Sequence, residues 1–245
     1  MPAEKIKFGA IFSSAEVQSA WKAIEPEIQK LEIPDGTGGI NPGDRRALFY
    51  LISYLKPLRV LEIGTHIGAS TVHIAAALQN WRKSENEECP KLISLDVKDV
   101  NDSITRPWKE HGTELSPFEM IKQIGCGNYV EFVTAASLNY MVGCEEKYDF
   151  IFIDGDHTAK TVYQEIPAAL KLLTQNGLIL LHDYFPKLKA LWSNGSIIPG
   201  PCLATDRLRK HSSQLSVLPL GRLPWATKLN SNITSLALLV RQLTK

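Results

Sequence analysis

Residues 60–70 read VLEIGTHIGAS, and this short segment sets the class of fold that the remaining sequence must fit. Its first four residues are mostly apolar, as in a buried strand, Gly64 follows them, and a helical pattern begins near Ser70. A glycine at such a turn lets the backbone come close to a bound molecule, and the helix that follows offers free N–H groups to an anion. We therefore expect a ligand-binding loop at the end of a strand.

Short apolar runs alternate with segments of helix length on either side of this loop. We expect strands at 59–63, 91–95, 129–133, 150–153 and 178–181, helices at 70–79, 117–124 and 161–173, and two final β-like runs at 214–218 and 233–240. Continuous apolar strands indicate a parallel sheet covered on both faces. The final two runs have no helix between them, which indicates antiparallel strands. The prediction is a Rossmann-like, doubly wound α/β fold with a mostly parallel seven-stranded sheet and an antiparallel C-terminal strand pair.

The first 57 residues are expected to form a helical cap. Ser13 and Glu16 have the spacing of a capping box, and Asp44 is expected to cap a second helix. Pro26 and Pro167 lie inside helical patterns and are expected to kink, split or restart them. We expect a single domain with a cap at 1–57, a cofactor-binding core at 58–185, and a substrate lid and sheet-completing tail at 186–245.

The composition restricts the class of protein. The chain has 245 residues with 44% hydrophobic and 22% charged residues, which is typical of a globular protein and excludes intrinsic disorder. A formal net charge of +1 gives no electrostatic reason to expect nucleic acid as a partner. No apolar run approaches the ~20 residues that span a bilayer, and we find no signal peptide. The four cysteines lack the spacing of a disulfide framework or a zinc cluster, so a cytoplasmic protein is expected.

The loop does not match the dinucleotide-binding fingerprint. That fingerprint is G-x-G-x-x-G with an acidic residue ~20 positions further on. This chain has G-x-x-x-G instead, and the next acid that ends a strand, Asp96, lies much further along. A hydride-transfer dehydrogenase is therefore disfavoured.

Four features in this order resemble class I S-adenosylmethionine (SAM)-dependent methyltransferases: the E-x-G-x-x-x-G turn, Asp96 after the second strand, Asp154 after the fourth, and the antiparallel finish. The segments LEIGT (61–65), IDGDH (153–157) and HDY (182–184) look most like small-molecule O-methyltransferases of the macrocin type, and more distantly like the catechol and caffeoyl-CoA enzymes. The resemblance covers residues 40–185 well. It implies methylation of a small hydroxylated metabolite or a sugar-containing natural product.

The resemblance also implies a set of cofactor-binding residues. These are Glu62, Gly64, Thr65, Gly68, Ser70, Asp96, Ser137 and Asp154. Asp96 would bind the ribose hydroxyls of SAM, Ser70 would lie near its carboxylate, and Ser137 falls where the family contacts adenine. The glycines and Glu62 would line the methionine end.

Ionisable side chains gather at the expected strand ends, where open α/β sheets bind ligands. Methyl transfer to an alcohol requires removal of its proton. His157 is the first choice of base, because it follows Asp154 by three residues, where the catechol enzyme carries its catalytic lysine; Asp154 and His182 are the other catalytic candidates. Alternatively, Asp154 and Asp183, with His182 or Asp156, could hold Mg²⁺, which would lower the pKa of the acceptor.

The metal-dependent relatives carry Asp-Asp or Asp-Asn after the fifth strand, whereas this chain has His182-Asp183, so both ways of activating the acceptor stay open.

Three further expectations concern function. The partner is a small-molecule methyl acceptor rather than nucleic acid or membrane, and a homodimer is expected. The segment 185–201 is interpreted as a lid or substrate wall. The main alternatives are a non-catalytic SAM-binding or scaffold protein and a different reaction on the same fold.

Overall fold

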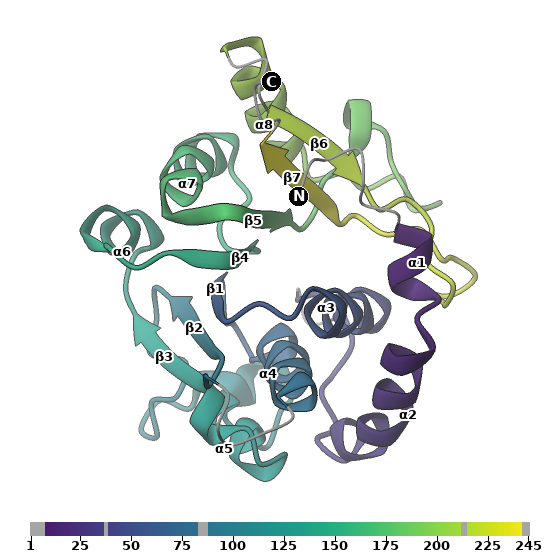
Figure 1. Cartoon of the computed structure of the whole chain (residues 1–245), viewed down its shortest axis with the longest axis vertical. Helices are drawn as coiled ribbons and strands as arrows, with labels where there is room; N and C mark the ends of the chain where they lie inside the picture. The colour runs from purple at the N-terminus through teal and green to yellow at the C-terminus, as the bar shows by residue number, and fades with distance from the viewer. Residues whose placement is uncertain (1–7, 37–38, 83–87, 212–214, 242–245) are drawn as a thin grey trace.

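The computed structural model describes residues 8–36, 39–82, 88–211 and 215–241. These residues contain a seven-stranded sheet in the order β3-β2-β1-β4-β5-β7-β6 (Figure 1). The strands are β1 (Arg59–Ile63), β2 (Lys91–Asp96), β3 (Val130–Thr134), β4 (Tyr148–Ile153), β5 (Leu173–Leu181), β6 (Leu215–Pro219) and β7 (Ala237–Arg241). Strands β1 to β5 pair in parallel, β7 is antiparallel to β5, and β6 is antiparallel to β7. The predicted sheet is therefore confirmed.

Helices cover both faces of the sheet. They are α1 (Phe8–Phe12), α2 (Ala15–Gln29), α3 (Pro42–Leu55), α4 (Ala69–Trp81), α5 (Pro117–Gln123), α6 (Ser137–Gly143), α7 (Ala159–Leu172) and α8 (Gly200–His211), with short 3-10 turns η2 (Pro107–His111), η3 (Gly127–Tyr129) and η4 (Pro186–Leu188). Figure 1 shows α3 and α4 on one face and α6 and α7 on the other. None of the helices within the described ranges combines the length and the apolar character that crossing a bilayer requires.

Successive residues of β1 belong to two different hydrophobic clusters. Val60 packs in the cluster with helices α1 to α5, and Leu61 and Ile63 pack in the cluster with α6 and α7. Each such buried aliphatic side chain stabilises the fold by ~1.5–3 kcal/mol. Glu62 is the exception, because it is a carboxylic acid with no exposed surface in the middle of this strand. A buried ionisable group in a core strand indicates a function other than packing.

Two glycines shape the turn between β1 and α4. Gly64 has φ +97°, and Gly68, with φ +76°, is the N-cap of α4. A Cβ at Gly64 would overlap the carbonyl oxygen of Asp154 at the end of β4. The turn therefore requires glycine for its backbone angle and for its contact. The loop expected to bind a ligand lies directly beside the end of β4.

The prolines do not divide their helices. Pro26 lies inside α2 and Pro167 inside α7, and both helices continue through them, so neither the split nor the restart occurs, and the kink or bend expected as the alternative stays a prediction. A proline inside a helix costs ~3 kcal/mol. Trp21 and Ile28 are buried on either side of Pro26, and Ile166 is buried beside Pro167. Since each of these side chains contributes ~1.5–3 kcal/mol, packing offsets the lost hydrogen bond.

Both predicted N-caps of the first two long helices were wrong. Ser14, not Ser13, caps α2 and accepts a backbone N–H three residues further on. Asn41 caps α3, accepting the backbone N–H of Asp44 at 3.0 Å. Pro42 at the first helical position fixes this earlier start, because its φ suits a helix and its missing N–H is not needed there. Asp44 consequently lies in the first turn of α3, where it is fully buried.

The C-terminal half differs from the prediction at its boundaries. Strand β5 begins at Leu173, five residues before the predicted start, so the segment 175–177, expected as a turn, lies within the strand. Its pairing with β4 shifts between Tyr148 and Phe150, an irregularity that takes up the extra residues. Strand β7 begins at Ala237 rather than at residue 233, and part of the expected run at 214–218 lies outside the described residues. Helix α1 was not predicted.

Candidate active site

A cleft of about 470 Å³ opens at the carboxyl ends of β1, β2 and β4. This is the edge at which open parallel sheets bind ligands. Six of the predicted cofactor residues line it: Gly64, Thr65, Ser70, Asp96, Ser137 and Asp154. The loop after β1, the ends of β2 and β4 and the start of α6 therefore contribute side chains to one cavity.

Glu62 and Gly68, the other two predicted cofactor residues, are not among the described residues that line this cleft. The Glu62 carboxylate accepts hydrogen bonds from the hydroxyls of Thr71 and Ser94, both at 2.6 Å. Burial raises the pKa of the Glu62 carboxyl to about 7, although these hydroxyls oppose the shift. Its Oε1 has no hydrogen-bond partner among the described residues. Gly68 faces Pro117, so it contributes to the loop rather than to the cavity.

Asp96 is held in a fixed orientation at the end of β2. Its Oδ2 accepts the backbone N–H of His66 at 2.9 Å, and its Oδ1 accepts that of Lys98 at 3.0 Å. A carboxylate has about four acceptor positions. Each oxygen of Asp96 therefore keeps acceptor capacity for a ligand hydroxyl, as binding of a ribose diol requires.

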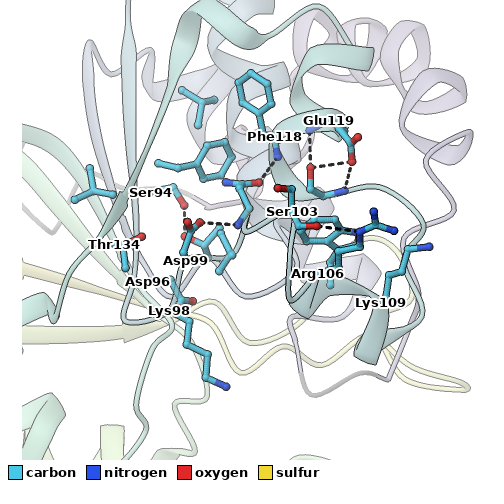
Figure 2. A pocket seen from close by; sticks show the side chains of 18 of the residues that line it. Ser94, Asp96, Lys98, Asp99, Ser103, Arg106, Lys109, Phe118, Glu119 and Thr134 are labelled. Atoms are coloured by element: carbon cyan, nitrogen blue, oxygen red, sulfur yellow. Dashed lines mark hydrogen bonds between the residues drawn. The ribbon is translucent and has the colours of Figure 1, made fainter.

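A second cavity, of about 800 Å³, adjoins the cleft at Asp96. Figure 2 shows Ser94, Asp96 and Thr134 on its strand side and Ser103 and Arg106 across from them. The described residues that line it include no side chain of the Asp154 loop or of the segment after β5. The second cavity thus extends the Asp96 end of the cleft and lacks the ionisable groups of the other end.

Four ionisable side chains meet at the ends of β4 and β5, and we call Asp154, His157, His182 and Asp183 the acid–imidazole cluster. His182 Nδ1 lies 2.7 Å from Asp154 Oδ1 and 3.6 Å from Asp183 Oδ2. His157 Nε2 lies 3.6 Å from Asp154 Oδ1 and 3.5 Å from Asp183 Oδ2. The structure therefore brings together every predicted catalytic and metal-binding residue. Asp156, the other acid considered, instead accepts hydrogen bonds from Thr158 and Thr161 at the start of α7.

The members of the cluster differ in their access to the cleft. Asp154 and His157 line the cleft. The side chain of His157 is 28% exposed, against 8% for His182 and 14% for Asp183. A Cβ at Gly200, the first residue of α8, would overlap the carbonyl oxygen of His157. The start of α8 therefore packs directly on the backbone of the most accessible member.

Burial alone would lower the pKa of the His182 imidazole, because a charged ring is poorly solvated there. The charges of Asp154 and Asp183 oppose this effect. Together with the hydrogen bond that the ring donates to Asp154 and the nearby carboxylate of Asp44, they raise the pKa of His182 well above its ordinary value. His182 is thus held among carboxylates in a region with little access to water.

Asp44 is a site residue that the sequence did not reveal. It is fully buried, accepts a hydrogen bond from the Asn41 amide at 2.7 Å, and places Oδ2 3.6 Å from His182 Nε2. Its Oδ1 has no hydrogen-bond partner within the part of the chain that the structure describes. In the sequence, Asp44 directly precedes the apolar run of α3, and this pattern predicts a helix cap rather than a site residue. The helical cap therefore supplies a carboxylate to the site.

His66 also lines the cleft and was not predicted as a site residue. Its ring centroid lies 4.3 Å from that of His111 in η2. Burial lowers the pKa of His66, and the neighbouring His111 lowers it further. The His66 ring thus lines the cleft beside Asp96, whose carboxylate accepts the backbone N–H of the same residue. Its positive φ, +50°, reflects the tight path of the loop.

A family model described as a methyltransferase domain matches residues 61–184, just over half of the chain. The match begins inside β1 and ends directly after Asp183, so it contains the glycine loop, Asp96 and the whole acid–imidazole cluster. Asp44 and the C-terminal strand pair lie outside it.

Known proteins resemble the chain beyond that segment. A curated protein of Mycobacterium sp. (strain JLS), named provisionally as an O-methyltransferase, is 26% identical over 174 residues, which are 71% of this chain and 70% of that protein. The O-methyltransferase from Bacillus cereus in complex with SAH has a TM-score of 0.57 at 17% identity, covering 94% of this chain and 92% of that one. The O-methyltransferase TomG from Streptomyces achromogenes, in complex with SAM, gives 0.58 at 15%, covering 94% and 91%. At these identities the two structures establish a shared fold.

Proposed function

The chain belongs to the methyltransferase domain family, and we propose that it transfers the methyl group of SAM to a hydroxyl oxygen of a small metabolite or a sugar-containing natural product. One observation carries the proposal. Asp96 at the end of β2 and the acid–imidazole cluster at the ends of β4 and β5 lie on either side of β1 and its glycine loop. A cofactor bound across this loop would have its ribose at Asp96 and its reactive end beside the cluster.

The side chains of the cleft fit SAM. Asp96 keeps acceptor capacity on both oxygens for the ribose hydroxyls, as the resemblance implies. Gly64 leaves the loop without a side chain where the methionine part would pass. Glu62, which the resemblance places at the methionine end, lies buried in β1 and is not among the described residues that line the cleft, so its contact with SAM stays a prediction. The SAM and SAH complexes of TomG and of the Bacillus cereus enzyme support the same choice of cofactor.

Methyl transfer from SAM is an in-line displacement. The acceptor oxygen forms a bond to the methyl carbon while the carbon–sulfur bond breaks, and the electron pair stays on sulfur to give S-adenosylhomocysteine. The proton of the acceptor must leave, and we propose that His157, Asp154 and His182 promote its departure. His157 is the member most open to the cleft, and a neutral imidazole in that position could take the proton directly.

The Mg²⁺ alternative does not fit the cluster. Two of its four donors are the imidazole nitrogens of His157 and His182. Mg²⁺ prefers an octahedron of oxygen ligands and usually keeps several waters. We therefore assign no step of the reaction to Mg²⁺.

We also propose that the chain is one domain with a helical cap at 1–57, a cofactor-binding core at 58–185, and a substrate lid and sheet-completing tail at 186–245. Trp192, in the segment interpreted as a lid, packs edge-on against Phe185 at 5.7 Å. The Lys228 ammonium lies 3.5 Å from the centre of the Trp192 ring, which ties this segment to the tail. These contacts would hold the segment beside the carboxyl end of β5.

We also propose that the enzyme acts in the cytoplasm on a small molecule, without nucleic acid or membrane as partner, and forms a homodimer. The four cysteines are free, as in a reducing compartment, and the net charge of +1 gives nucleic acid little attraction. Static light scattering tests the homodimer: a mass of twice 27.3 kDa is expected, and the monomer mass would contradict it.

The proposal is tested by incubating the protein with SAM and a panel of sugars, phenols and other hydroxylated molecules, with S-adenosylhomocysteine release as the readout. We expect release that depends on one class of acceptor. His157→Ala should lose at least about a hundredfold in turnover with its affinity for SAM intact. His211→Ala, at the exposed end of α8, is the matched control and should keep full activity. SAM binding without turnover on any acceptor would favour the non-catalytic alternative instead.

A further inference from the structure

The second cavity lies apart from the groups that are proposed to promote methyl transfer. It is formed by the edge strand β3, the end of β2, and the segment that connects β2 to α5 together with the start of α5 (Figure 2). Its volume, about 800 Å³, falls within the range of ~300–1,000 Å³ that is usual for small-molecule sites. It shares Thr65 and Asp96 with the cleft, and its described lining residues include no member of the acid–imidazole cluster. A molecule bound there would therefore lie at the Asp96 end of the cleft and would not be the methyl acceptor.

Charged side chains of both signs line the second cavity. Its cations are Lys98, Arg106 and Lys109, and its carboxylates are Asp96, Asp99, Glu114 and Glu119. Figure 2 shows Lys98 on the side of Asp96, and Glu119 across the cavity on the side of Arg106. An anion would therefore meet carboxylates on either side, and a cation would meet an ammonium or guanidinium group on either side. A hydroxyl group both donates and accepts hydrogen bonds, so it can bond to charged groups of both signs.

Some of these charged groups already have partners within the protein. Lys109 Nζ lies 3.1 Å from Glu114 Oε2. The carboxylate of Glu119 accepts the backbone N–H and the hydroxyl of Ser116, at 2.8 and 2.9 Å, as part of the capping box of α5. These groups are occupied, so a ligand would be recognised mainly by the others.

Two cations and one carboxylate keep free hydrogen-bonding groups. Arg106 donates from Nε to the carbonyl oxygen of Ser103 at 3.0 Å, and within the described ranges its terminal nitrogens have no partner. Lys98 Nζ likewise has no partner among those residues. Asp99 accepts the backbone N–H of Asn101 with Oδ1, which leaves Oδ2 as an acceptor. Free donors and a free acceptor therefore line the same cavity.

Aromatic side chains give the second cavity an apolar surface. Phe118, at the start of α5, is 53% exposed although it lines the cavity, and Phe132 of β3 is half-buried. Trp108 is buried, and its indole Nε1 has no hydrogen-bond partner among the described residues, whereas buried polar groups normally find one. The C–H face of a sugar ring packs on aromatic rings, and its hydroxyls would supply the acceptor that Trp108 lacks.

We propose that the second cavity binds a neutral, polyhydroxylated molecule of the sugar or polyol class. Phe118 provides its apolar surface, and Lys98, Asp99 and Arg106 provide its hydrogen-bonding groups. A wholly apolar ligand would leave these charged groups without partners and cost the hydration that they have in water. The site goes beyond the proposed function, because its ligand is neither SAM nor the methyl acceptor.

The test measures binding by the full chain in the absence of SAM. The probes are glucose, galactose, rhamnose, maltose and sorbitol, with inorganic phosphate as the anionic comparison and spermidine as the cationic one. Saturation-transfer difference NMR detects contact with the protein, and calorimetric titration gives the affinity. We expect saturable binding of at least one of the sugars or of sorbitol, at least about tenfold tighter than that of phosphate or spermidine.

Variants locate the site. Phe118→Ala should weaken binding about tenfold through loss of the aromatic contact. Arg106→Met keeps the stem of the side chain but loses its charged donors, so it should weaken binding by at least about tenfold. Ile104→Ala, which changes a side chain that is 89% exposed in the same segment, and Lys122→Met, on the exposed face of α5, are the matched controls. Neither control residue lines the cavity, and both variants should bind like the wild type. Circular dichroism of each variant checks that it is folded.

Three results would overturn the inference: no binding of any sugar or of sorbitol by the wild-type protein, binding of phosphate or spermidine as tight as that of the sugars, or wild-type affinity in folded Phe118→Ala or Arg106→Met. The last result would mean that the sugar binds elsewhere, for example in the cleft as a methyl acceptor. Failure of the proposed function has a different sign, which is absence of SAM binding or turnover. The two failures are distinguishable because the sugar titration contains no SAM and requires no methyl transfer.

Discussion

The loop after β1 and the helix α3 both supply residues to the site, yet only the first could be interpreted from sequence. The loop carries its information locally, since Gly64, Gly68 and the strand before them lie within ten residues of one another. The role of Asp44 depends on its contact with His182. These two residues lie far apart in the sequence and come close together only in the folded protein. A local motif therefore identifies the glycine loop, whereas the role of Asp44 depends on a tertiary contact.

The largest expected effect concerns the glycine loop after β1. Gly64→Ala should remove detectable SAM binding, because a Cβ would overlap the Asp154 carbonyl and the φ of +97° is strained for alanine. Such strain costs of the order of 1–3 kcal/mol before the clash is counted. Gly195→Ala is the control, since Gly195 has a similar φ of +72° but no atom within 4 Å of the added Cβ. Calorimetric SAM titration of both variants makes the comparison, and SAM binding by Gly64→Ala at wild-type affinity would contradict it.

The next effect is a pH dependence of stability that originates at Glu62. Its pKa is about 7 in the folded protein, against 4.5 for a glutamate side chain in water. The folded state therefore holds this proton more tightly than the unfolded state, so the contribution of Glu62 to stability falls as the pH rises from about 4.5 to 7. At 1.36 kcal/mol per pH unit the loss amounts to about 3 kcal/mol.

Glu62→Gln removes this proton equilibrium and keeps an acceptor for Thr71 and Ser94. Between pH 5 and 8, the free energy of unfolding of the wild type should therefore fall relative to that of the variant. Urea denaturation at pH 5, 6, 7 and 8 measures the difference. A constant difference across this range would show that Glu62 ionises normally despite its burial.

The contact between the start of α8 and the backbone of His157 gives a smaller effect. Gly200→Ala should displace the backbone of His157 and lower kcat about 10–100-fold, since small misplacements of catalytic groups have effects of this size. SAM affinity should change little, because Gly200 is not among the described residues that line the cleft. Gly127→Ala, with open space at its Cβ, is the control. Equal kcat in Gly200→Ala and wild type would show that the loop of His157 tolerates displacement.

The smallest expected effect separates two neighbouring serines. Ser14→Ala should destabilise the protein by about 1 kcal/mol, because Ser14 caps α2. Ser13→Ala should have almost no effect, although the sequence spacing favoured Ser13 as the cap. Urea denaturation of the two variants decides between them, and a larger loss for Ser13→Ala would restore the original interpretation.

The sequence predicted what depends on local pattern. The order of strands and helices follows from runs of apolar residues, and the antiparallel finish follows from the absence of a helix between the last two runs. The acids Asp96 and Asp154 could be placed because each directly follows a strand, and parallel strands end at one edge of the sheet. His157 and His182 could be predicted for the same reason.

The remaining features depend on packing that a linear pattern does not contain. Pro26 and Pro167 leave their helices unsplit because buried neighbours offset the missing hydrogen bonds. The extra length of β5 depends on pairing with β4 at Tyr148. The sequence pattern indicates a cap at Asp44 because it does not reveal that Pro42 starts α3 earlier, and the contact of Asp44 with His182 spans more than half of the chain.

Binding of SAM in the cleft beside Asp96 is the central claim, and one calorimetric titration tests it most directly. Wild-type protein should bind SAM with micromolar or tighter affinity, Asp96→Ala should lose this binding, and Asp206→Ala, which changes an exposed acid of α8 that lines neither cavity, should keep it. Absence of SAM binding by the folded wild type, or binding that Asp96→Ala retains, would contradict the claim.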